Sequence, residues 1–125
     1  MATGAQEPQV LTVEDDERIQ RLIETVLRAE GYVVVSAQDG VSALDILDHA
    51  TPGVILLDLM MPGLDGWELL RRVREKGLEI PVALISAVRD LPEQAEKLGA
   101  ADSLSKPFDV NELVSEVETY VERSA

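Results

Sequence analysis

The sequence contains no cysteine, one histidine and few aromatic residues, and each scarcity excludes a class of protein. Without cysteine there is no disulfide, no thiol nucleophile and no cysteine-ligated zinc. A Ser-His-Asp hydrolase would have to use His49, but no G-x-S-x-G motif accompanies it, so we expect His49 on a helix surface. Aromatic residues make up 3% of the chain, so the core must be built from Val, Leu, Ile and Ala.

Positive charge is also scarce, because 11 Lys and Arg stand against 24 Asp and Glu, for a net charge of -13 at pH 7. Such a chain cannot neutralise a row of phosphates, so we expect no direct nucleic-acid partner and no adhesion to anionic membranes. No signal-peptide pattern is present, and no apolar run approaches the roughly 18 residues that span a bilayer. We expect a cytoplasmic location, and a protein or a cation as the partner.

Short apolar runs of strand length alternate with segments of helical period along the 125 residues. The runs lack the alternation of half-exposed strands, which favours strands covered on both faces. The pattern predicts an α/β domain with a doubly wound, flavodoxin-like, five-stranded parallel sheet in the order 2-1-3-4-5. Residues 1–8 look loose, and residues 9–123 form the domain. The expected strands are 10–13, 33–35, 54–57, 82–85 and 102–104, with helices between them.

Polar side chains stand at the carboxyl ends of four of these strands, where doubly wound sheets bind ligands. Glu14 and Asp15 follow the first strand, and Asp58 follows the third, which is its neighbour in the sheet. Crowded carboxylates repel each other, so this group needs a cation, and oxygen ligands favour Mg²⁺. Ser86 and Lys106 add a hydroxyl and an ammonium at the same edge. Together these groups indicate phosphoryl transfer.

Each residue taken alone has a plainer interpretation. An acidic run such as Glu14 to Asp16 is commonly a helix N-terminus, which favours negative charge. Asp58 could cap a loop, Ser86 could be a turn residue, and the Lys106-Pro107 pair could be a surface turn. Their order along one fold, which brings them to one edge of the sheet, favours a shared site. Trp67 is expected to pack rather than to bind a ligand.

Four motifs are similar to those of the receiver domain of two-component response regulators. They are V-E-D-D at 13–16, L-L-D-L-M-M-P-G-L-D-G at 56–66, I-S-A at 85–87 and K-P-F at 106–108. The resemblance covers about residues 9–123 and is closest to the chemotaxis-regulator-like, single-domain form. It implies that Asp58 accepts a phosphoryl group. It also implies a Mg²⁺ site formed by Glu14, Asp15, Asp58 and the Met60 backbone carbonyl, with Asp16 just outside.

The resemblance also assigns roles around the phosphoryl group. The Ser86 hydroxyl and the Ala87 backbone N–H would donate to its oxygens. Lys106 would pair first with Asp58 and then with the phosphoryl group, and the Lys106–Pro107 bond would be cis. Met60 and Val88 would flank the route of the attacking water, where their bulk could slow hydrolysis.

The implied function is a phosphoacceptor switch. A histidine kinase or phosphotransfer protein would phosphorylate Asp58, and the domain would catalyse only its own phosphorylation and dephosphorylation. An unknown downstream protein would bind the face formed by 91–98, 102–105 and 111–123. The sequence ends without a DNA-binding module, so we expect either a stand-alone regulator or an excised receiver, and Met1 favours the former.

Two departures from the family fall on this expected output face. Ser103 stands where the family usually has an aromatic residue, and the stretch from Ser86 to Gly99 is shorter than usual and contains Pro92. A phosphate sink or a pseudo-receiver with little conformational output therefore stays open, although a pseudo-receiver would be expected to lack a site residue. A haloacid-dehalogenase-type phosphatase is disfavoured, because Met60 stands where its second Asp would act as acid and base.

Overall fold

The computed structural model describes residues 7–123, so the prediction of a loose segment at 1–8 falls mainly outside the described residues. Strands and helices alternate along this range, as the sequence predicts. They are β1 (Val10–Val13), α1 (Glu17–Ala29), β2 (Val34–Ala37), α2 (Gly40–Leu47), β3 (Val54–Leu57), α3 (Gly66–Glu75), β4 (Val82–Ser86), α4 (Leu91–Leu98), β5 (Asp102–Ser105) and α5 (Val110–Tyr120).

The strands form one parallel sheet in the order β2-β1-β3-β4-β5, which confirms the predicted topology. Val13 pairs with Leu57 across β1 and β3, so the residues that follow these two strands begin at the same level. The predicted bounds of β2 were wrong, because the strand continues through Ser36 to Ala37. Ser36 interrupts the apolar run without ending the strand, since its hydroxyl donates to the Glu24 carboxylate on α1.

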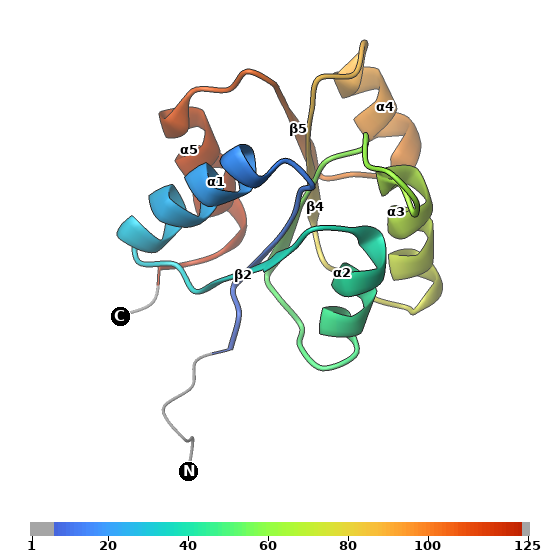
Figure 1. Cartoon of the computed structure of the whole chain (residues 1–125), viewed down its shortest axis with the longest axis horizontal. Coiled ribbons are helices and arrows are strands. Elements are labelled where there is room, and N and C mark those ends of the chain that lie inside the picture. Colours follow the sequence, from blue (N-terminus) through green and yellow to red (C-terminus); the bar gives the residue numbers. More distant parts are fainter. Residues whose placement is uncertain (1–6, 124–125) are drawn as a thin grey trace.

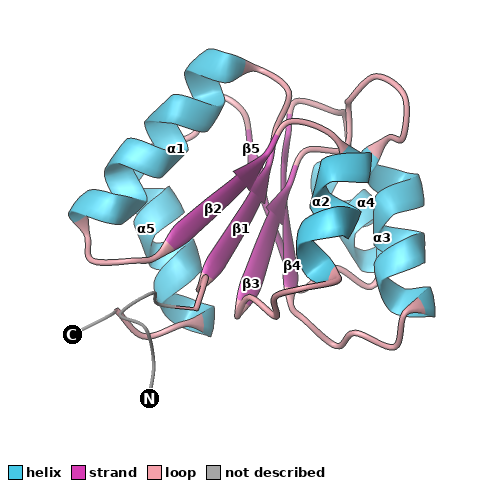
Figure 2. Cartoon of the chain, turned by 60° about the horizontal axis from the view of Figure 1, so that its bottom comes forward, coloured by secondary structure: helices cyan, strands magenta, loops and turns pink. Residues whose placement is uncertain are grey.

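Helices cover both faces of the sheet, as Figures 1 and 2 show, with α1 and α5 on one face and α2, α3 and α4 on the other. Each face has its own buried apolar cluster, built mainly from Leu, Val, Ile and Ala as the composition predicts. Trp67 packs half-buried against one of them, and its Nε1 donates to Gln94 Oε1 on α4 at 3.4 Å. His49 is exposed just after α2, as expected. Leu22 is 43% exposed and lies outside the buried stripe of α1.

Gly66 lets α3 begin directly against the loop that follows β3. A Cβ at this position would lie 2.5 Å from the Asp58 carbonyl oxygen and 2.6 Å from the Leu59 Cα, distances that side chains do not tolerate. The absence of a side chain at residue 66 therefore sets how closely α3 approaches Asp58.

Aspartate side chains cap the N-termini of four helices. The side chains of Asp16, Asp39, Asp65 and Asp109 accept backbone N–H groups at the starts of α1, α2, α3 and α5. These bonds satisfy donors that a helix start leaves without partners. Asp109 and Glu112 form a complete capping box, as the D-x-x-E pattern predicts. Asp90 occupies the N-cap position of α4, but its φ is 54° and its side chain makes no cap hydrogen bond to any described residue.

The two kinds of helix start predict opposite effects of mutation. Asp109→Ala removes a working cap and should lower the free energy of unfolding by about 1 kcal/mol. Asp90→Gly relieves a left-handed backbone that disfavours a side chain, and should raise it by up to about 1 kcal/mol. Urea denaturation of both variants measures the difference. Equal losses of stability in the two variants would contradict this view of α4.

Candidate functional site

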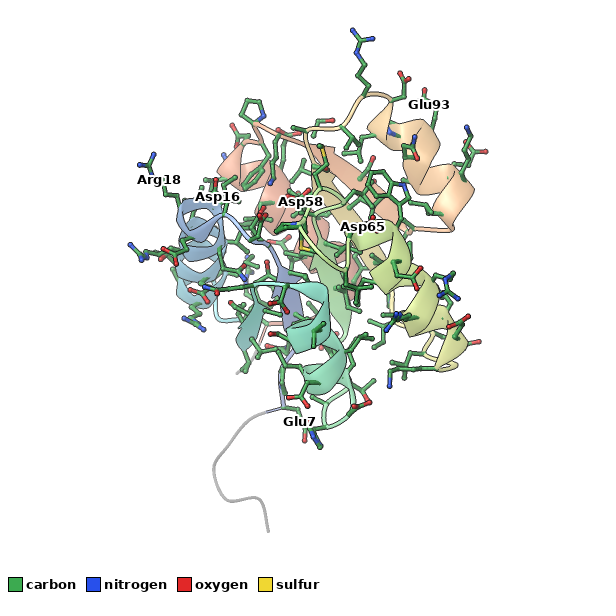
Figure 3. The ribbon with its side chains drawn as sticks, turned by 45° about the vertical axis from the view of Figure 1, so that its right-hand side comes forward. Glu7, Asp16, Arg18, Asp58, Asp65 and Glu93 are labelled. Atoms are coloured by element: carbon green, nitrogen blue, oxygen red, sulfur yellow. The ribbon has the colours of Figure 1, made fainter. Side chains whose placement is uncertain are left out.

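Asp58 follows β3 directly, and its side chain is held by three donors. Its Oδ1 accepts from the Ser86 hydroxyl at 2.9 Å and from the Met60 backbone N–H at 3.0 Å, while its Oδ2 accepts from Lys106 Nζ at 2.9 Å. Asp58 is only 5% exposed. In the view of Figure 3 it lies between Asp16, at the start of α1, and Asp65, at the start of α3. The carboxylate is therefore fixed in orientation at the carboxyl edge of the sheet.

Lys106 joins two buried carboxylates. Its Nζ lies 2.9 Å from Asp58 Oδ2 and 2.5 Å from Glu14 Oε1, in the loop between β5 and α5. Burial alone would lower the pKa of Lys106, but the hydrogen bonds and charges of Glu14 and Asp58 outweigh burial and raise it. The ammonium is thus held in its charged form. The family resemblance implied the contact with Asp58, and the contact with Glu14 was not predicted.

Glu14 is 2% exposed at the end of β1. Burial is the main reason that its pKa is raised to about 7; the charge of Asp58 adds to this effect, and the hydrogen bond from Lys106 opposes it. The Asp16 backbone N–H also donates to Glu14 Oε2, at 3.1 Å. Glu14, Asp15 and Asp58 together place three carboxylates beside the single ammonium of Lys106, so a further cation would reduce the repulsion among them.

Glu14, Asp15 and Asp58 each offer a carboxylate oxygen, and these oxygens lie within 4.8 Å of one another. Asp15 is exposed, so the group opens to solvent on one side. Oxygen ligands from a few carboxylates, with space for water, are what Mg²⁺ requires, so the residues present fit this ion. Met60 lies beside them, because its N–H donates to Asp58.

The remaining sequence-predicted residues lie around this pocket. Asp16 is the N-cap of α1, so the plainer interpretation of the acidic run holds for Asp16, while Glu14 and Asp15 point elsewhere. The Lys106–Pro107 bond is cis, as the resemblance implies. Ala87 is exposed, and with Lys106 it helps to line an apolar hollow of about 370 Å³. The other lining residues are Ile19, Leu22, Pro107 and Phe108.

Sequence reasoning missed a buried polar pair that joins β1 to α1. Thr12 in β1 and Gln20 in α1 are 1% and 6% exposed and are bonded to each other. The available signal was a Gln next to Ile19 and one turn before Ile23, at a position of α1 that faces the core.

No helix in the part of the chain that the structure describes is long and apolar enough to cross a membrane.

Comparison with known proteins agrees with this architecture. Residues 10–118 match the family described as the response regulator receiver domain. The chain is 38% identical over 110 residues to YkoG of Bacillus subtilis, which is named an uncharacterised transcriptional regulatory protein. That match covers 86% of this chain and 48% of YkoG, so the chain spans about half the length of this relative.

Two solved structures are similar over nearly the whole fold. The receiver domain of the Francisella response regulator 1452 has a TM-score of 0.84 and 35% identity, covering 90% of this chain and 95% of that one. TrrA of Thermotoga maritima, solved in complex with Mg²⁺ and BeF, has a TM-score of 0.82 and 26% identity, covering 91% and 99%. The chain belongs to the response regulator receiver domain family, and is therefore a signalling domain of two-component systems.

The crowded carboxylates predict that Mg²⁺ stabilises the fold. An ion that binds only the folded state adds about 2.7 kcal/mol at a concentration of one hundred times its Kd, so Mg²⁺ should raise the melting temperature. Asp15→Asn removes one of the three like charges, so it should raise the melting temperature without metal and reduce the further gain with Mg²⁺. Differential scanning calorimetry across a Mg²⁺ titration measures both effects.

Glu17→Gln is the matched control, because it removes the same charge from an exposed position two residues along the chain. It should leave the gain with Mg²⁺ unchanged. A melting temperature that no concentration of Mg²⁺ alters would show that these carboxylates do not hold the ion.

Proposed function

We propose that this domain is a phosphoacceptor switch of a two-component system, phosphorylated at Asp58 by a histidine kinase or a histidine phosphotransfer protein. The observation that carries the proposal is the buried Asp58 carboxylate, which a hydroxyl and an ammonium from two other strand ends hold in one orientation. A carboxylate so fixed is prepared for attack on a phosphorus presented from the open side of the pocket.

In the proposed reaction, a carboxylate oxygen of Asp58 attacks the phosphorus of a phosphohistidine, and the phosphorus–nitrogen bond breaks. Lys106 stays beside the transferred group and neutralises its oxygens, and the Ser86 hydroxyl and the Ala87 N–H donate to them. Fixed donors of this kind supply most of the rate in phosphoryl transfer. Water later cleaves the aspartyl phosphate, so the domain returns to its starting state without being a turnover enzyme.

A bound Mg²⁺ would supply additional positive charge at the phosphoryl oxygens. Glu14, Asp15, Asp58 and the Met60 carbonyl are the residues that we propose to hold it, supported by the cluster of carboxylate oxygens. Met60 is 60% exposed beside this pocket, and Val88 is half-buried, so we propose that their side chains restrict the approach of water to the aspartyl phosphate. The cytoplasmic location and the absence of direct nucleic-acid binding stay predictions.

The chemistry is tested with a small phosphodonor. Incubation with acetyl phosphate and Mg²⁺ should add one phosphoryl group, and mass spectrometry of peptides should place it on Asp58. Asp58→Asn should abolish the addition, and Lys106→Met should slow it by about 100-fold, because one fixed donor to the developing charge is lost. Asp65→Asn changes another Asp of the same loop and should be phosphorylated like the wild type. Phosphoryl addition that survives in Asp58→Asn would place the acceptor elsewhere.

We propose that the downstream partner binds the face formed by α4, β5 and α5, which contains 91–98, 102–105 and 111–123. A hollow of about 310 Å³ lies on this face between α4 and β5, lined in part by Ala95, Ala100 and Ser103. Ser103 is half-buried there and has no ring to fill the hollow. Nearby, burial and the neighbouring Asp102 carboxyl raise the pKa of Glu116 to about 8, so this face carries less negative charge at neutral pH than its sequence implies.

The start of α4 is the segment that we propose to change on phosphorylation. It follows Ser86 closely in the chain, and it begins at Asp90 with a left-handed backbone and no side-chain cap bond to any described residue. A helix start without a side-chain cap opens at a lower free-energy cost than a capped one. This supports a coupling route through 87–92 rather than through an aromatic residue at position 103.

Amide chemical shifts with and without beryllofluoride test this route. Changes should concentrate in residues 86–105, and the Trp67 indole N–H should also shift because it donates to Gln94 on α4. Ser103→Tyr should alter partner affinity if this face is the one that the partner binds. Changes confined to the contacts of Asp58 would instead favour a phosphate sink, which is the alternative function.

A further inference from the structure

Five polar or charged residues are buried in the part of the chain that the structure describes. Three of them, Glu14, Asp58 and Ser86, belong to the pocket described above. The other two are Thr12 and Gln20, and the Thr12 hydroxyl donates to Gln20 Oε1 at 2.9 Å. Burying a polar side chain is unfavourable unless its hydrogen bonds are made, so the place and the partners of this pair require a reason.

Gln20 uses its whole amide group. Its Oε1 accepts from Thr12, and its Nε2 donates to the carbonyl oxygens of Thr12 at 3.3 Å and Ala37 at 2.9 Å. One side chain of α1 is therefore bonded to the last residue of β2 and to the penultimate residue of β1. An apolar side chain could fill this space, but it could not fix the two strand ends to the helix.

These bonds continue directly into the acidic pocket. The Ala37 carbonyl that accepts from Gln20 also accepts the Glu14 backbone N–H, at 3.1 Å. The Gln20 backbone N–H donates to the carbonyl of Asp16 at 2.9 Å, and the Asp16 N–H donates to the Glu14 carboxylate. The turn that contains Glu14 and Asp15 is thus held at both ends by groups that Gln20 contacts.

We propose that Gln20 is a positioning residue for the Mg²⁺ site, and that it acts by fixing the Glu14–Asp16 turn against the ends of β1 and β2. This inference rests on the proposed function, because it assigns a role toward the same ion. Gln20 touches neither the ion nor the phosphoryl group. Partners that orient metal ligands typically change metal affinity by 10- to 100-fold when they are mutated.

Gln20→Met tests the proposal, because Met keeps the length and the helix propensity of Gln but makes none of the three bonds. The Kd for Mg²⁺, measured by calorimetry on the full chain, should rise about tenfold. Amide hydrogen exchange at Glu14 should become faster, since its N–H is bonded to the same carbonyl as Gln20. Thr12→Val removes only the bond from the Thr12 hydroxyl and should raise the Kd by a smaller factor.

Ile23→Val is the control for a general loss of stability. Ile23 is a buried residue of α1, one turn further along, with no bond to the pocket turn among the described residues. It should lower the melting temperature while leaving the Kd for Mg²⁺ and the Glu14 exchange rate close to those of the wild type. If Gln20→Met does not fold, the comparison of Thr12→Val with Ile23→Val decides in its place.

The outcomes separate this inference from the proposed function. A wild-type Kd in folded Gln20→Met, or equal Kd values in Thr12→Val and Ile23→Val, would overturn the positioning role alone. Phosphorylation of Asp58 in the wild type would then still support the proposed function. A wild-type protein that binds no Mg²⁺ and accepts no phosphoryl group would overturn both.

Discussion

The contact of one ammonium with two buried carboxylates is the interaction on which the site depends. Lys106 comes from the far end of the sequence, while Glu14 and Asp58 come from β1 and β3, so the three meet only if the sheet is complete. An isolated buried charge is strongly destabilising, and two carboxylates beside each other are more so. Lys106 reduces this repulsion, but it is one ammonium beside the three carboxylates of Glu14, Asp15 and Asp58. This excess of carboxylates over ammonium groups suits a divalent cation.

The order of the strands turns separate sequence motifs into one pocket. β1 and β3 are neighbours at the centre of the sheet, and all strands end at the same edge, so residues far apart in the chain meet there. The close approach at Gly66 brings α3 against the Asp58 loop, and the bonds of Gln20 bring α1 against the ends of β1 and β2. The carboxylates therefore lie between the starts of α1 and α3.

The strands and helices could be predicted from local signals, and the grouping of Glu14, Asp58, Ser86 and Lys106 could be predicted from the strand order together with the family motifs. Apolar runs predicted the strands, and the D-x-x-E patterns at Asp65 and Asp109 correctly predicted the starts of α3 and α5. Contacts that depend on side-chain direction could not be predicted. No pattern showed that Lys106 reaches Glu14 as well as Asp58, or that Gln20 turns inward to two carbonyls. Ser36 misled the prediction of β2, because its partner on α1 lies twelve residues away in the sequence.

Helix α4 differs from the other helices in how it begins, and this difference separates two properties of the domain. The residues that hold and orient Asp58 lie on β4, in the loop after β3 and in the loop after β5, whereas the left-handed Asp90 lies outside all of them. Under the proposed function, substitutions at the start of α4 would change how that helix responds to phosphorylation while leaving the carboxylate pocket intact. Within one fold, the sensitivity of a signal could then diverge between relatives while the reaction that produces it stays the same.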